Sequence, residues 1–179
     1  MKNAINLWVG VDIVLTLQKV QPTEENILHS IMQFYIYEFS RYIPSIILEQ
    51  DGTYVPFNLE KYWVNSNFHA YFIKLEDEFI GFALVESSTE SSPNTIQEFF
   101  IMAKYSGNGY GKEIAKKVFT MFPGDWKITQ IEKNKPARYF WQGIINDICK
   151  GEFTERFEGG KYIQEFNTKS ECKISNHRI

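Results

Sequence analysis

Cysteine and histidine are scarce in this sequence, which has two cysteines and three histidines among 179 residues. So few cysteines make no disulfide framework, and we expect Cys149 and Cys172 to be free thiols in a reducing, cytoplasmic environment. His29, His69 and His177 lie far from one another and from the cysteines, without the short spacings of metal ligands. The sequence therefore predicts neither a disulfide scaffold nor a metal site.

Long apolar runs and an excess of positive charge are also absent. The run from Ile13 to Leu17 is flanked by Asp12 and Gln18, and no stretch approaches the roughly 20 apolar residues of a membrane helix. No signal peptide is visible. The net charge of -3 argues against nucleic-acid binding, which usually needs a basic patch, and is compatible with a cationic amine. We expect a cytoplasmic protein that binds neither membranes nor nucleic acids.

The composition is that of a globular protein, with 44% hydrophobic and 23% charged residues. This length favours one domain with a sizeable core. Aromatic residues reach 16%, and such a surplus often lines a pocket as well as a core. We place the domain at residues 11–167, between an N-terminal extension at 1–10 and a polar tail at 168–179.

Apolar periodicity and turn residues predict an alternation of strands and helices along this domain. Thr23 is expected to cap the first helix, and Gly159-Gly160 to form the last hairpin turn. We expect strands at 11–21, 68–75, 79–86, 95–102, 126–132, 152–158 and 161–167, and helices at 22–40, 58–65, 109–122 and 135–148. This order implies an α/β layered domain with a mixed sheet.

A glycine-rich segment, Ser106-Gly107-Asn108-Gly109-Tyr110-Gly111, separates the strand at 95–102 from the body of the next helix. Glycines at alternate positions allow tight turns and close approach to a ligand. The first amides of a helix lack partners within it and carry partial positive charge, which suits a pyrophosphate. Lys104 and Lys112 bracket the segment and can add charge. A turn that merely caps the helix would show the same local pattern.

The segment differs from the two better-known phosphate loops. A Walker loop ends in Gly-Lys-Ser/Thr, whereas Gly111-Lys112 is followed by Glu113. A dinucleotide fingerprint lies near the first strand and spaces its glycines unevenly, whereas this loop comes late and its glycines are evenly spaced. If the loop binds phosphate, it is of another kind.

A second segment, from Asn134 to Trp141, follows the loop after one expected helix and one strand. Together the two segments resemble the GNAT superfamily of acetyl-coenzyme A-dependent N-acetyltransferases. That family has a loop of pattern Gln/Arg-x-x-Gly-x-Gly/Ala, then an Asn, an Ala three residues later and an aromatic pair. Asn134, Ala137, Phe140 and Trp141 match the second pattern, and the glycines match the first, with Ser106 in place of Arg or Gln. The order of elements over residues 11–167 also fits.

The resemblance implies an α/β fold with a mixed, splayed β-sheet flanked by helices. The pantetheine arm of acetyl-coenzyme A (acetyl-CoA) would lie where the fourth and fifth strands splay apart. The residues that the resemblance assigns to acetyl-CoA binding are Ile101, Met102, Ala103, Ser106, Gly107, Asn108, Gly109, Tyr110, Gly111, Lys112, Asn134, Ala137, Phe140 and Trp141.

The activity implied by the resemblance is acetyl transfer from acetyl-CoA to a primary amine of a small molecule or peptide. The amine would attack directly in a ternary complex, on a monomer or homodimer without metal. Many family members place a tyrosine acid where this chain has Trp141, whose indole N–H is no useful proton source. Tyr139 lies about 200° around the helix and is not expected to substitute. A non-catalytic acetyl-CoA-binding regulatory module, or an interaction protein that kept only the fold, are the alternatives.

Candidate residues for the chemistry are few. Glu98, on the strand before the loop, is the candidate base, although strand alternation leaves its facing undecided and a solvent-facing residue would look the same. His69 has a suitable unperturbed pKa, but a lone histidine is more often structural. Tyr35, Glu38 and Tyr54 are expected near the acceptor, since carboxylates and aromatic rings suit a cation, although each ring can equally serve in packing.

Overall fold

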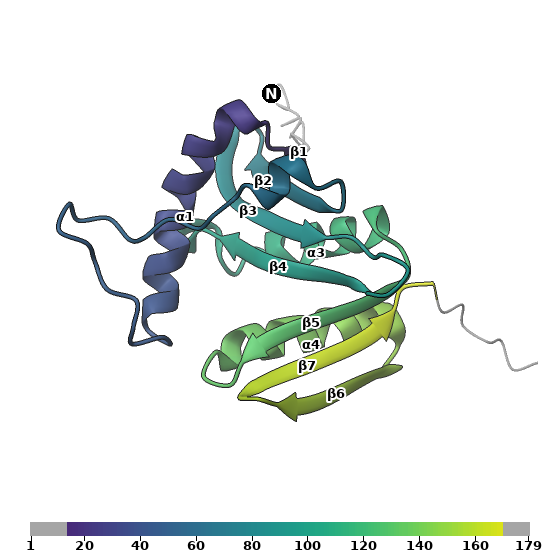
Figure 1. Ribbon diagram of the computed structural model, residues 1–179. Coiled ribbons are helices and arrows are strands. Elements are labelled where there is room, and N and C mark those ends of the chain that lie inside the picture. Colours follow the sequence, from purple (N-terminus) through teal and green to yellow (C-terminus); the bar gives the residue numbers. More distant parts are fainter. Residues whose placement is uncertain (1–13, 170–179) are drawn as a thin grey trace, which may run out of the picture.

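The computed structural model describes residues 14–169, which form one seven-stranded sheet covered by helices (Figure 1). The strands are β1 (Leu15–Lys19), β2 (Phe68–Leu75), β3 (Glu78–Glu86), β4 (Asn94–Ile101), β5 (Asp125–Ile131), β6 (Phe153–Glu158) and β7 (Lys161–Asn167). The helices are α1 (Glu25–Ser40), α2 (Lys61–Val64), α3 (Tyr110–Met121) and α4 (Lys135–Cys149). The 3-10 turns are η1 (Pro22–Glu24) and η2 (Ala103–Tyr105). The extension at 1–10, Cys172 and His177 lie outside the described residues.

The expected α/β fold with a mixed sheet is confirmed, and its strand order is β1-β2-β3-β4-β5-β7-β6. The prediction of Thr23 as helix cap is wrong. Thr23 lies inside η1, and the residue before α1 is Glu24, which makes no side-chain capping bond there. Glu24 Oε2 instead accepts the Gln21 N–H at 2.9 Å, so its carboxylate closes the 3-10 turn.

Two hydrophobic clusters lie on opposite faces of the sheet. Alternation along β2 directs Phe72 toward α1 and Ile73 toward α3 and α4, and both side chains are fully buried. Helix α1 buries residues three and four apart, including Leu28, Met32 and Tyr35, which gives it one apolar face. Burying each large apolar side chain contributes roughly 1.5–3 kcal/mol, so both helix layers are firmly attached.

The sheet opens between β4 and β5, which are parallel. The two strands share ladder positions at Asn94↔Trp126 and Thr95↔Lys127 and then diverge, as Figure 1 shows. Asn94 is buried at the closed end, where its amide donates to the Phe122 and Asp125 carbonyls at 3.3 and 3.0 Å. The splay expected between the fourth and fifth strands is therefore confirmed, and Asn94 fixes the point from which it opens.

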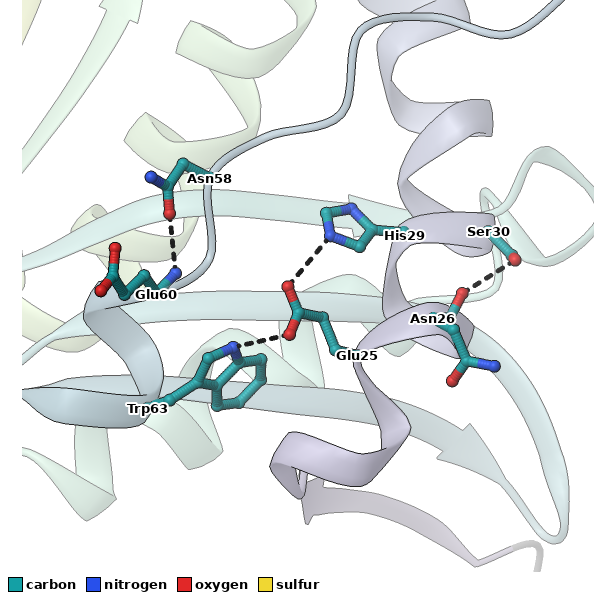
Figure 2. Close-up of polar contacts among 7 residues, drawn as sticks. All are labelled: Glu25, Asn26, His29, Ser30, Asn58, Glu60 and Trp63. Atoms are coloured by element: carbon teal, nitrogen blue, oxygen red, sulfur yellow. Dashed lines mark hydrogen bonds and ion pairs between the residues drawn. The ribbon is translucent and has the colours of Figure 1, made fainter.

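A polar clamp attaches α2 to α1 (Figure 2). Glu25 on α1 accepts a hydrogen bond from Trp63 Nε1 at 3.1 Å, and its other carboxylate oxygen lies 3.3 Å from His29 Nε2. Before α2, Asn58 Oδ1 accepts the Glu60 N–H at 2.9 Å, which shapes the approach to the helix. The connection between α1 and α2 extends away from the body of the domain (Figure 1). Where it rejoins the domain, these hydrogen bonds hold α2 against α1. His29 therefore has a structural partner.

Candidate active site

The splay between β4 and β5 forms a cavity of about 520 Å³. Its walls come from α1, β4, β5 and the start of α4, including Tyr35, Glu98, Phe99, Gln130, Asn134 and Trp141. Predicted site residues from three separate segments of the sequence therefore line one cleft: Tyr35, Glu98, and Asn134 with Trp141.

The glycine loop leads from η2 into α3, and none of residues 101–112 is among those that line the 520 Å³ cavity. Gly107 and Gly109 have φ angles of +81° and +83°, a conformation that costs other L-residues roughly 1–2 kcal/mol. Gly109 is the residue before α3 and offers no side chain to cap it, so the first helical amides are left for another acceptor. Positive φ and an uncapped helix start are the geometry that an anion-binding loop needs.

The polar side chains around the loop mostly serve its own structure. Asn108 Nδ2 donates to the carbonyl oxygens of Tyr105 and Ser106 at 3.2 and 3.4 Å. Lys112 forms an ion pair with Asp147 on α4. Lys104, beyond the loop's other end, lies 3.6 Å from Glu78. With both lysines paired to acids, the backbone amides are the main groups available to bind a phosphate.

The two motifs of the sequence touch each other. A Cβ atom at Gly111 would lie 3.3 Å from the Phe140 ring on α4, so a glycine allows this close approach. Asn134 caps α4, with its Oδ1 accepting the Ala137 N–H at 3.2 Å. The glycine loop and the Asn134–Trp141 segment are thus parts of one structure.

Trp141 is packed into the wall of the cleft and is only 5% exposed. Its ring lies 5.2 Å from that of Phe99 and 4.9 Å from that of Phe140, between centroids. Tyr139 is 62% exposed and is not among the residues that line the cleft. The neighbouring tyrosine therefore does not take the place of a tyrosine at 141.

A β-bulge sets the facing of Glu98, which alternation alone left open. Leu84 of β3 pairs with Glu98, but the next residue, Val85, pairs with Ile96, so Gln97 is the extra residue on β4. As a result both Glu98 and Gln97 contact side chains from the α1 and α2 side. Glu98 accepts a short hydrogen bond from the Tyr35 hydroxyl, and Gln97 Oε1 accepts one from Lys61 at 3.3 Å.

The environment of Glu98 suits proton transfer near neutral pH. Burial raises the pKa of the Glu98 carboxyl to about 7, and the Tyr35 hydrogen bond and the positive charge of Lys61 partly oppose this rise. Burial and the negative charge of Glu98 also raise the pKa of the Tyr35 hydroxyl, which therefore stays protonated as a donor. Glu98 can thus be ionised at neutral pH and still accept a proton readily.

The other predicted candidates lie elsewhere. His69 is on β2, where Nε2 lies 3.1 Å from Ser87 Oγ and the ring packs on Phe122, and burial lowers its pKa. Glu38 pairs with Arg41 one turn later on the surface of α1. Tyr54 exchanges backbone hydrogen bonds with the Gln33 side chain, at 2.7 and 3.1 Å. Of the three acceptor candidates, only Tyr35 contacts Glu98.

Four further residues near Glu98 and the cleft are not predicted from the sequence: Lys61, Tyr62, Gln97 and Gln130. Lys61 and Tyr62 lie on α2, which was expected as a short helix without a role. Gln97 reaches Lys61 because of the bulge, which depends on the β3–β4 register. Gln130 lies on β5, 5% exposed, within a chain of side-chain hydrogen bonds through Gln164. The local sequence carries no distinctive signal for these residues.

Residues 14–169 offer neither a metal site nor a membrane span. No group of three or more His, Cys, Asp or Glu side chains in this part of the chain is arranged to hold a metal ion. None of its helices is long and apolar enough to cross a membrane. Cys149 is a free thiol buried against the core, and burial raises its pKa, which disfavours the reactive thiolate form.

An open sheet splayed beside a glycine loop at a helix start is the architecture of acyl-CoA-dependent N-acyltransferases. Residues 28–143 match the model of the acetyltransferase (GNAT) family. The chain belongs to the GNAT acetyltransferase family, as the resemblance of its motifs predicted. Comparison with curated protein sequences gives no match.

Solved structures share this fold at low sequence identity. An acetyltransferase from Thermus thermophilus superposes with a TM-score of 0.63 at 17% identity, covering 85% of this chain and 94% of that one. The ribosomal-protein-S18-alanine N-acetyltransferase of Escherichia coli gives 0.60 at 10% identity, covering 90% and 98%. A Bacillus anthracis protein assigned as a streptothricin acetyltransferase, solved with acetyl coenzyme A, gives 0.54 at 12% identity, covering 85% and 97%.

Proposed function

We propose that this protein is an N-acetyltransferase that moves the acetyl group of acetyl-CoA to a primary amine, with Glu98 as general base. The observation that carries the proposal is the position of Glu98. Its carboxylate lies in the wall of the splayed cleft, beside Tyr35, with a pKa of about 7. Membership of the family supports acetyl transfer, and this carboxylate supplies the group that the chemistry requires.

The glycine loop would hold the pyrophosphate of acetyl-CoA. The amides at the start of α3 point out of the helix and carry its partial positive charge. The pantetheine arm would then follow the end of β4, near Ile101, Met102 and Ala103, into the cleft. The solved Bacillus anthracis structure, which contains acetyl coenzyme A, supports this cosubstrate for the fold.

The reaction would proceed in a ternary complex. The amine nitrogen attacks the thioester carbonyl carbon, so that a C–N bond forms and the C–S bond breaks. The proton that leaves the nitrogen passes to Glu98, directly or through one water molecule. The products are the N-acetylated amine and coenzyme A, whose thiolate takes its proton from solvent or from the protonated Glu98.

The tryptophan at position 141 affects how the leaving coenzyme A thiolate can be protonated. Because an indole N–H does not supply protons at neutral pH, we propose that coenzyme A leaves as a thiolate without a dedicated acid. A thiolate is a good leaving group, since thiol pKa values lie near 8.5. The packing of Trp141 against Phe99 and Phe140 instead shapes the cleft wall.

The alternative function is an acetyl-CoA-binding module without turnover, which the tryptophan at 141 would favour. Titration calorimetry with acetyl-CoA tests binding, and thiol release across a panel of amines tests transfer. Binding together with release supports the enzyme. Binding without release from any amine supports the module, and no binding overturns both.

A further inference from the structure

A second, smaller cavity adjoins Glu98 on the side of α2. Its volume is about 230 Å³, and Glu98 lines both this cavity and the larger cleft. Its apolar wall is formed by Phe57, Leu59, Tyr62 and Leu84. An acceptor whose amine reaches Glu98 can therefore place its remaining atoms here, in a space of small-molecule size.

Lys61 brings a positive charge into this cavity. Its side chain is partly buried, and its Nζ lies 4.6 Å from the Phe68 ring centroid and 5.3 Å from that of Tyr62. Among residues 14–169, no carboxylate lies within ion-pair distance of Nζ, and its one hydrogen bond goes to Gln97 Oε1 at 3.3 Å. An ammonium has three donors, so this cation has unused capacity for a partner.

The Gln97 amide bonds to Lys61 through its oxygen and to Glu86 through its nitrogen. An ionised carboxylate only accepts hydrogen bonds, so the Gln97 amide nitrogen faces Glu86 Oε2, at 2.8 Å, and its oxygen faces Lys61. This orientation gives Lys61 a neutral partner, while the Glu86 carboxylate accepts a hydrogen bond from the same amide group. The positive charge therefore stays available to the cavity.

Lys61 is also held in position by its helix. The clamp in which Glu25 binds Trp63 ties α2 to α1, and α1 carries Tyr35, the partner of Glu98 (Figure 2). The positive charge of Lys61 is near enough to Glu98 to lower the pKa of its carboxyl. A cation and a base thus line one small cavity, on elements fixed to each other.

We infer that the acceptor is a small amine that also carries a carboxylate, such as a free amino acid, and that Lys61 binds that carboxylate while Glu98 faces the amine. This inference rests on the proposed acetyl transfer and names its substrate class. A single ammonium matches a singly charged anion, and a charge-assisted hydrogen bond in a partly buried site is about twice as strong as a neutral one. The apolar wall would receive the amino acid side chain.

The test compares L-leucine, L-methionine and L-phenylalanine with their carboxamides, which keep the size and the amine but lose the carboxylate. Initial rates of coenzyme A release are measured over a range of pH, for the wild type and each variant, up to the pH at which the rate no longer rises. Each kcat/KM is expressed per unprotonated amine, because loss of the carboxylate makes the amine less basic. The acids are expected to exceed the amides in kcat/KM by about tenfold or more, mainly through KM. If the wild type has equal kcat/KM for amides and acids, the inference is overturned, and peptide N-termini become the expected acceptors.

Variants of Lys61 separate recognition from structure. Lys61→Met keeps the aliphatic stem on the aromatic rings and should erase the preference for acids, whereas Lys61→Arg should retain most of it. Lys19→Met, an exposed lysine on β1 at the far edge of the sheet, is the matched control and should change nothing. Persistence of the preference in Lys61→Met would overturn the assignment of Lys61.

Binding measurements keep this inference separate from the proposed transfer. Calorimetry of the protein saturated with coenzyme A is carried out with each acid and amide. If no amine is acetylated, the proposed enzyme fails, but acids that bind at least tenfold more tightly than amides, in a manner dependent on Lys61, still support the carboxylate site. Absence of binding by every acid at millimolar concentration overturns it.

Discussion

Tyr35 on α1 donates a hydrogen bond to the carboxylate of Glu98 on β4, across 63 residues of sequence. This contact joins helix α1 to β4 within the lining of the splayed cleft. It also fixes the direction of the Glu98 carboxylate, because the Tyr35 ring is packed against Phe82 and Phe100. The proposed base is therefore oriented by a rigid aromatic cluster.

Glu98→Gln tests the base directly. The amide has the same size but cannot take up the amine proton, so kcat should fall by about 100-fold or more. The acid limb of the wild-type pH profile, with an apparent pKa of about 7, should disappear. Affinity for acetyl-CoA, measured by calorimetry, should stay the same. A variant with full activity would remove Glu98 from the mechanism.

The same substitution should change how stability depends on pH. The pKa of Glu98 is raised to about 7 in the folded protein from an ordinary value of 4.5, so its contribution is favourable below pH 4.5 and is lost as pH rises through 7. The stability of Glu98→Gln relative to wild type should therefore rise between these two pH values, to a gain of at most about 3.4 kcal/mol above pH 7. Urea unfolding at several pH values measures the difference; a constant difference from pH 4 to 8 would contradict it.

Tyr35→Phe removes the hydrogen bond that lowers the pKa of Glu98. The carboxyl pKa should rise further, and the acid limb of the activity profile should move to higher pH. At pH values above this limb much of the activity should return, because Glu98 is again ionised. Tyr37→Phe, on the same helix but 60% exposed, is the matched control and should leave the profile in place. An unmoved profile in Tyr35→Phe would argue against Glu98 as the titrating base.

Gly109 allows a test of the phosphate loop with two nearly isosteric variants. Asn and Asp tolerate positive φ better than other L-residues, so both should fold with similar stability. Gly109→Asp places a negative charge where the pyrophosphate would lie and should abolish measurable acetyl-CoA binding, whereas Gly109→Asn should weaken it far less. Calorimetry with acetyl-CoA measures both dissociation constants. Equal affinities would refute the assignment of this loop.

Much of the fold could be predicted because its signals are local. A short run of apolar and aromatic residues located β2 with the same bounds as in the structure. The positive φ angles at Gly107 and Gly109 explain why glycines mark the loop. The Asn134 cap also depends only on local sequence, since its side chain accepts a hydrogen bond from the Ala137 amide three residues later.

What could not be predicted depends on register and on contacts between distant segments. The facing of Glu98 follows from the bulge at Gln97, which exists only when β3 and β4 are aligned. Lys61 meets Gln97 across 36 residues, through a helix of four residues that has little periodicity of its own. Thr23 suits a cap by its chemistry, but the preceding 3-10 turn places it elsewhere.

The central claim is that the cleft transfers acetyl groups as well as binding acetyl-CoA. Mass spectrometry of a reaction containing protein, acetyl-CoA and a broad panel of amines, run beside Glu98→Gln, tests it most directly. We predict an N-acetylated amine, formed in equal amount to the free coenzyme A, with wild type and a loss of about 100-fold or more in its rate with the variant. Acetyl-CoA binding without an acetylated product from any amine would contradict the account.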